Sequence, residues 1–168
     1  MNKYKSFTIV CMYIILTISI TLPALAEKPS DENALKDISQ AKVIWDITIS
    51  DPKRLLRVMR VISTTYDDLV EQNVQPQMIF AFRGGVLRLL DNSEKERSSE
   101  DDQAHQELLL LINEISMRNG VVMESCSVAA HLMGIDNENI ITEVVPVGNT
   151  FVSLIGYQQQ GYALIPIY

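Results

Sequence analysis

Short apolar runs alternate with segments of helical spacing along most of the chain, and this alternation limits the folds that the chain can adopt. Strands that alternate with helices form mostly parallel sheets with helices on both faces. An α/β fold with a mostly parallel sheet is therefore predicted. The predicted strands are residues 42–49, 78–82, 120–125, 140–147 and 162–165.

The first of these runs also predicts which side chains share a face of the sheet. Alternation within residues 42–49 places Val43, Trp45 and Ile47 on one face. Asp46 falls on the opposite face, and a carboxylate inside a strand is unusual. We expect Asp46 to be solvated or hydrogen-bonded at an interface; a role in orienting a group near a functional site is the alternative.

Capping signals and apolar periodicity predict the helices between the strands. Asp51 can cap a helix that starts at Pro52 and continues to about Glu71. Asn119 and Gly120 are predicted to end the preceding helix, because both residue types readily adopt the left-handed backbone conformation found at helix C-termini. The other predicted helical segments are residues 86–90, 106–118, 128–133 and about 150–161.

The N-terminus matches a secretory signal peptide. It has a basic start, an apolar run over residues 7–22 and an A-x-A motif that ends at Ala26. Cleavage is predicted after Ala26, and we expect the mature protein to be exported to the periplasm. An uncleaved membrane anchor is the alternative, although the apolar run is near the short limit for a membrane span.

Export divides the chain into three parts and changes its charge. We expect residues 1–26 to be the signal peptide, residues 27–40 a flexible segment and residues 41–168 a single domain. Cleavage removes Lys3 and Lys5 and no acid, so the net charge goes from −7 to −9. This acidity argues against nucleic acid and anionic membrane surfaces as partners, because both favour basic patches.

The sequence offers no pattern for a metal or a bound cofactor. Residues 91–105 are predicted to form a charged surface loop, but they lack the glycine and the ligand spacing of a calcium loop. His105 and His131 stand at unrelated spacings from the cysteine, so no metal site is predicted. His131 lies five positions after Cys126, roughly 140° around a helix, which does not support a catalytic Cys–His pair. We expect His131 at a surface or interface.

Cys126 is the candidate catalytic residue. It is the one cysteine left after the predicted cleavage, because Cys11 leaves with the signal peptide, and a lone thiol excludes an intramolecular disulfide. Cys126 lies between the end of a predicted strand and the start of a predicted helix, where helix-end amides favour the thiolate. Free cysteines are also among the most buried residues, so a small structural side chain is the alternative.

Arg83 and two glycines, beginning with Gly84, follow the predicted strand at residues 78–82. A glycine pair permits close approach of the backbone to a ligand, and Arg83 can hold an anion there. Two glycines are not a phosphate-loop motif, so an ordinary tight turn is the favoured local interpretation. Because sites in parallel sheets form beyond the carboxyl ends of strands, Arg83, Gly84 and Ser127 are the candidate substrate-binding residues around Cys126.

Several short motifs occur in order between the first predicted helix and the C-terminus. They are the Asp-Pro pair at 51–52, Gly84, the Gly-Val pair at 120–121 before Cys126, Pro-Val-Gly at 146–148 and Gln-Gln-Gln-Gly-Tyr at 158–162. The ordered set resembles the DsrE/DsrF-like family of sulfur-relay proteins over nearly all of residues 41–168. The resemblance implies a three-layer α/β/α domain with a five-stranded parallel sheet, assembled into small homo-oligomers. It also implies that Cys126 accepts sulfur as a persulfide and passes it on.

Two features depart from the family pattern. Similar members often carry a histidine just before the glycine that follows the second strand, where this chain has Arg83, so no role of that histidine is carried over. The best-understood members act in the cytoplasm, whereas this chain is predicted to be exported. That difference argues against transfer RNA thiolation and leaves the handling of sulfur outside the cytoplasm.

Two functions of different classes follow. In the first, an exported sulfur carrier or sulfurtransferase-like protein uses Cys126 to take sulfur from a sulfane-sulfur donor and to hand it to a thiol acceptor protein. Arg83 would steer an anionic donor such as thiosulfate. In the second, the fold is a non-catalytic oligomeric binding or scaffold module, and Cys126 is structural. A thiol redox protein is a third option, but without a C-x-x-C pair it needs a resolving cysteine on a partner.

Overall fold

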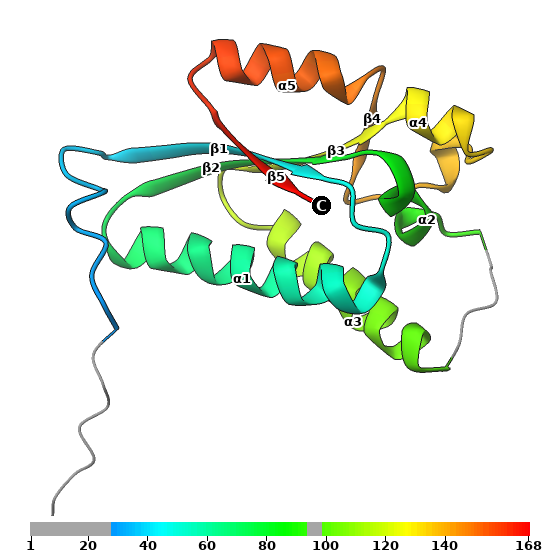
Figure 1. The fold of residues 1–168 in the computed structure, drawn as a ribbon, viewed down its shortest axis with the longest axis horizontal. Helices are drawn as coiled ribbons and strands as arrows, with labels where there is room; N and C mark the ends of the chain where they lie inside the picture. The colour runs from blue at the N-terminus through cyan, green and yellow to red at the C-terminus, as the bar shows by residue number, and fades with distance from the viewer. Residues whose placement is uncertain (1–27, 94–98) are drawn as a thin grey trace, which may run out of the picture. The chain divides into compact units, whose positions relative to one another are not determined.

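Five strands form one sheet in the order β4-β3-β2-β1-β5, and every adjacent pair is parallel (Figure 1). The computed structural model describes residues 28–93 and 99–168, so the predicted signal peptide lies outside the described residues. The predicted α/β class and the five-stranded parallel sheet are confirmed. The strands are β1 (Gln40–Ile47), β2 (Gln75–Phe82), β3 (Val121–Cys126), β4 (Val145–Val147) and β5 (Ala163–Ile167).

Helices cover both faces of the sheet, which gives three layers (Figure 1). α1 and α3 pack on one face and enclose the larger hydrophobic core, whereas α5 covers the other face. No helix of the described ranges is long and apolar enough to cross a membrane. The helices are α1 (Pro52–Glu71), α2 (Leu87–Leu90), α3 (Ser99–Ser116), α4 (Ser127–Leu132) and α5 (Thr150–Gln159), with short 3-10 turns η1 (Gly84–Val86) and η2 (Asn137–Asn139).

The two faces of β1 follow the predicted alternation. Val43, Trp45 and Ile47 are buried in the larger core with α1 and α3. Ile44 faces the other way and belongs to a smaller cluster with Leu154 of α5. Because side chains alternate along a strand, the same face of β1 also carries Asp46 toward the α5 layer.

The first helix has the predicted boundaries. The Asp51 carboxylate accepts a hydrogen bond from the Arg54 amide at 2.6 Å, Pro52 is the first helical residue, and the helix ends at Glu71. These signals lie within the segment itself. The Asp51 side chain accepts a hydrogen bond from an otherwise free backbone amide, and proline at the first helical position has no amide hydrogen that needs a partner. Local sequence was therefore enough to place this helix.

Tertiary packing overrides the prediction for residues 91–105. We expected a charged loop up to His105, but α3 already begins at Ser99. Ala104 and His105 are buried, and the His105 ring donates a hydrogen bond to the Leu89 carbonyl at 2.6 Å. These contacts with a distant segment stabilise helical turns that the polar sequence did not predict.

The strands at the end of the chain also differ from the prediction. The expected strand at residues 140–147 is reduced to Val145–Val147. Ile140 instead forms an isolated antiparallel bridge with Asp91, and Ile140 and Ile141 are both buried in the larger core. β5 continues through Pro166, which we had placed after the strand. β5 is an edge strand, and proline is tolerated there because the outer side of an edge strand pairs with no neighbouring strand and needs no N–H donor.

Candidate functional site

The strand order brings Asp46, Arg83 and Cys126 to one edge of the sheet. β1, β2 and β3 are neighbours, and their carboxyl ends lie together. Phe82 pairs with Ser125 in the register, so the residues that follow them, Arg83 and Cys126, lie side by side on adjacent strands. The two predicted site residues therefore do share one rim, which the sequence could not establish without the strand order.

Cys126 ends β3 and is the N-cap residue of α4. It is free and only 5% exposed. Its side chain makes no strict capping hydrogen bond, yet several donors face the sulfur. Burial opposes ionisation, but the amides of Thr150, Ala129 and Val128 and the Thr150 hydroxyl outweigh it and lower the pKa of the Cys126 thiol below its ordinary value. The thiolate is thus stabilised within a nearly closed site.

Thr150 is a site residue that sequence reasoning missed. The pairing of Cys126 with Val147 and a 3.3 Å hydrogen bond from the Val128 amide to the Gly148 carbonyl hold the start of α5 against the cysteine. Thr150 is fully buried, and its Oγ1 has no hydrogen-bond partner among the described residues. Its hydroxyl is therefore available to donate a hydrogen bond to a sulfur anion. In the sequence, the only signal at Thr150 was a predicted helix start at residue 149 or 150.

Arg83 is held by Asp46. The guanidinium donates from Nε and Nη2 to the two Asp46 oxygens, each at 2.7 Å, and it lies 4.9 Å from the centre of the Phe151 ring. Hydrogen bonding to Asp46 raises the pKa of Arg83 above its usual value, and the nearby Cys126 adds to this effect. Asp46 is 5% exposed, so the expected solvated carboxylate is wrong, and its two hydrogen bonds orient Arg83 as the alternative had it.

The other two predicted binding residues have roles within the fold. Gly84 has a φ of 67°, a conformation that favours glycine, and a Cβ on Gly85 would come within 3.0 Å of Ser50. The turn geometry alone accounts for the glycine pair. The Ser127 hydroxyl accepts a hydrogen bond from Asn137 at 3.0 Å, which ties the residue after the cysteine to η2.

A second buried carboxylate, Glu124, lies two residues before Cys126 on the same face of β3. Its Oε1 accepts a hydrogen bond from the Tyr157 hydroxyl at 2.8 Å, and its Oε2 has no partner within the described part of the chain. Burial and the hydrogen bond to Glu124 raise the pKa of Tyr157 to about 12. No pattern in the sequence pointed to this pair, because Tyr157 comes from a distant helix.

Neither histidine belongs to the site. His105 is buried against Leu89, which gives it the partner that the sequence did not reveal. His131 is exposed on the last turn of α4. Within the described ranges, no three histidine, cysteine, aspartate or glutamate side chains are grouped to hold a metal ion.

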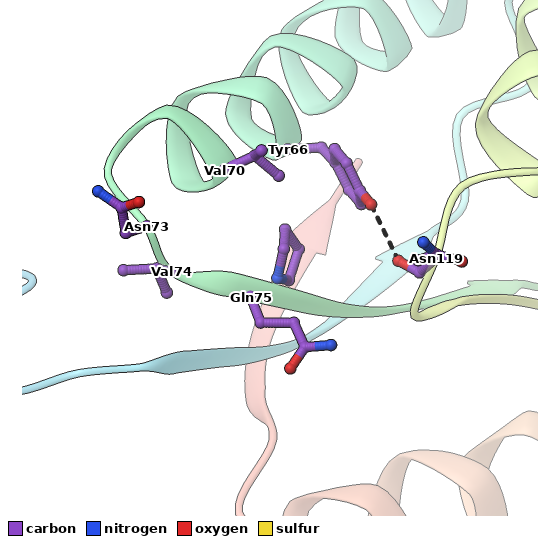
Figure 2. Close-up of a pocket in the computed structure, with 7 residues that line it drawn as sticks. Tyr66, Val70, Asn73, Val74, Gln75 and Asn119 are labelled. Carbon is purple, nitrogen blue, oxygen red and sulfur yellow. Dashed lines mark hydrogen bonds between the residues drawn. The ribbon is translucent and has the colours of Figure 1, made fainter.

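Two hollows in the described surface lie away from Cys126. One of about 350 Å³ is found near the amino end of β2, beside a hydrogen bond from the Tyr66 hydroxyl to the Asn119 carbonyl (Figure 2). Another of about 330 Å³ lies against β1 and β5 on the α1 side, where its lining includes Trp45, Thr65 and Ile165. Neither hollow contains the thiol or Arg83, so neither is part of the candidate site.

Comparison with known proteins identifies a family and solved structures of similar fold. The model of the DsrE/DsrF-like family matches residues 51–167. A structure of a protein of unknown function from Methanobacterium thermoautotrophicum aligns with a TM-score of 0.57 and 18% identity, over 75% of this chain and 98% of that chain. The ychN protein from E. coli aligns with a TM-score of 0.52 and 15% identity, over 76% of this chain and 99% of that chain. These structures are similar in fold; no curated protein matches the sequence.

Proposed function

This chain belongs to the DsrE/DsrF-like family, and from that premise we propose that it is a sulfur-relay protein in which Cys126 carries sulfur as a persulfide. The observation that carries the proposal is the setting of the thiol. Cys126 is almost buried, yet neutral donors from two helices lower its pKa. A structural cysteine needs no such donors, whereas a nucleophile that works as a thiolate does.

The proposed reaction has two transfers. In loading, the Cys126 thiolate attacks the outer sulfur of a donor, a new S–S bond forms, and the group that leaves the donor keeps the electron pair of the broken bond. In unloading, an acceptor thiolate attacks the outer sulfur of the persulfide and Cys126 departs as a thiolate. A lowered thiol pKa favours both steps, because Cys126 attacks as an anion and leaves as one.

Thr150 supports the same function from the side of α5. The Oγ1 of Thr150 is buried without another partner among the described residues. A neutral thiol is a weak acceptor, whereas a thiolate or a persulfide anion accepts a hydrogen bond strongly. The hydroxyl therefore suits a site whose sulfur is charged during its work.

The test is intact-mass spectrometry of the mature protein after incubation with polysulfide, with Cys126→Ser in parallel. We expect wild type to gain sulfur that a reductant removes, and the variant to gain none. Since Cys11 falls in the predicted signal peptide, the mature protein offers one thiol. Equal loading of the variant, or an unmodified wild-type thiol, would contradict the proposal.

We also propose export through the signal peptide at residues 1–26 and assembly into a homo-oligomer. Mass measurement of protein from the periplasmic fraction should find a chain that begins at Glu27. Light scattering should find more than one copy per particle. A full-length chain or a monomer would contradict the respective proposal.

A scaffold module is the second candidate, and exposed apolar side chains on α5 favour it. Phe151, Val152 and Ile155 are each more than half exposed, as expected of a surface that binds a partner. In that case Cys126 would be structural, and a thiol reagent would react with it only after denaturation. Fast reaction in the folded protein would count against the scaffold.

A further inference from the structure

The cation beside the thiol is already neutralised. Asp46 receives two hydrogen bonds of 2.7 Å from Arg83, and its side chain is 7% exposed while that of Arg83 is 25% exposed. The pair therefore carries no net charge. An anion that approaches Arg83 also meets the field of the Asp46 carboxylate, so the site provides little net attraction for anions.

The thiolate itself is stabilised mainly by neutral groups. The amide and hydroxyl of Thr150 and the amides of α4 are the leading favourable influences on Cys126. Thr150 Oγ1 carries no charge, and it is buried without a hydrogen-bond partner among the described residues. The site can thus form a nucleophile without a free cation that would also select an anionic substrate.

Exposed apolar side chains belong to residues at or next to the amides that act on the thiol. Val128 and Phe151 adjoin the amides that face Cys126, and they are 49% and 55% exposed. The Phe151 ring also covers one face of the Arg83 guanidinium. Leu132 extends the apolar surface along α4 at 80% exposure. The exposed surface near the thiol is therefore apolar at these three residues, and the chain as a whole has a net charge of −7.

We propose that the sulfur donor is a neutral, apolar form of sulfane sulfur, such as cyclo-octasulfur, and not a small dianion such as thiosulfate. The inference rests on the proposed function and names its substrate class. It reverses the expectation that Arg83 steers an anionic donor, because Asp46 cancels the charge that would do so. Apolar sulfur instead gains free energy by leaving water for the surface around Val128 and Phe151.

The proposed step balances without a further reactant. The Cys126 thiolate attacks one sulfur of the ring, a bond forms between the two sulfurs, and one S–S bond of the ring breaks. The electron pair and the negative charge move to the far end of the opened chain. The Cys126 sulfur is oxidised, the terminal sulfur is reduced, and no proton is consumed.

The test compares two donors on the mature protein by intact mass. Wild type is incubated with dispersed cyclo-octasulfur or with thiosulfate, and with polysulfide as the measure of general competence. We expect faster loading by cyclo-octasulfur. Asp46→Asn removes the charge that neutralises Arg83, so the ratio of its thiosulfate rate to its cyclo-octasulfur rate should rise about tenfold over that of wild type at low salt.

A second variant avoids the buried ion pair. Val128→Lys adds a cation at an exposed position beside the thiol and should speed thiosulfate loading while slowing cyclo-octasulfur loading. Val61→Lys is the matched control, because Val61 is 66% exposed on α1, on the opposite face of the sheet, and should change neither rate.

The outcomes separate this inference from the proposed function. Faster loading of wild type by thiosulfate, or an unchanged donor preference in folded Asp46→Asn and Val128→Lys, overturns the apolar donor and leaves the sulfur relay intact if polysulfide loads Cys126. Failure of all three donors to load Cys126 overturns both proposals.

Discussion

Thr150 opens α5 and favours the thiolate of Cys126 through its amide and its hydroxyl, although it lies 24 positions later in the chain. Thr150 Oγ1 is buried and has no hydrogen-bond partner among the described residues. A buried polar group without a partner costs about 1–3 kcal/mol. That cost is offset when the sulfur is an anion, so Thr150 at the start of α5 favours the thiolate of Cys126.

Thr150→Val should therefore raise the pKa of Cys126. Valine keeps the shape of the side chain and removes the donor, whereas Thr150→Ser keeps the donor and serves as the control. The pH dependence of the alkylation rate with iodoacetamide reports the pKa directly. We expect the profile of the valine variant to move to higher pH and that of the serine variant to stay close to wild type. Identical profiles for all three proteins would exclude a role for the hydroxyl.

Tyr157 should ionise at a higher pH than an ordinary tyrosine. Burial and Glu124 raise its pKa from 10.0 to about 12. Folding thus favours the protonated phenol, so its contribution to stability is complete below pH 10 and is lost as the pH rises toward 12. Absorbance titration should show one late tyrosine, and Tyr157→Phe should remove it. Glu124→Gln should lower the pKa of Tyr157; an unchanged late transition in that variant would contradict this cause.

The two histidines should differ in their effect on stability. His105→Leu removes the donor to the buried Leu89 carbonyl and should cost about 1–3 kcal/mol. His131→Leu changes an exposed residue and should stay within about 0.5 kcal/mol of wild type. Denaturant unfolding followed by the emission of Trp45, the single tryptophan, measures both. Equal costs would show that the His105 hydrogen bond contributes little.

Gly120→Ala should be more destabilising than Gly134→Ala. Both glycines have positive φ values, 76° and 68°, so alanine costs about 1–2 kcal/mol at either position. A Cβ on Gly120 would also meet the Pro76 carbonyl oxygen, whereas nothing lies within 4 Å at Gly134. We expect a further cost of about 1–3 kcal/mol at Gly120, measured by the same unfolding experiment. A difference near zero would mean that β2 moves aside freely.

Features that depend on neighbouring residues were predictable from the sequence. The cap at Asp51 and the proline after it placed α1, because both act within one turn of the helix. Alternation in β1 assigned Trp45 and Asp46 to opposite faces for the same reason. Predicting that Cys126 lies at the end of a strand required only the order of one strand and the helix that follows it.

Features that depend on distant residues could not be predicted from the sequence. The helical turns before residue 106 depend on the contact of His105 with Leu89. The short β4 goes with the pairing of Ile140 with Asp91 outside the sheet. The length of these elements depends on which distant residues they can pack against. The periodicity of the sequence carries no information about those contacts.

The sequence by itself determined the fold class, the first helix and the place of Cys126 at the end of a strand, because periodicity and caps act over a few residues. Only the tertiary structure decided the site around that thiol. The order β3-β2-β1 placed Arg83 between Cys126 and Asp46, and the pairing of β4 with β3 placed Thr150 beside the sulfur. Strand order follows from the free energy of the whole packed chain, so no local pattern could reveal that Arg83 is neutralised or that Thr150 is near.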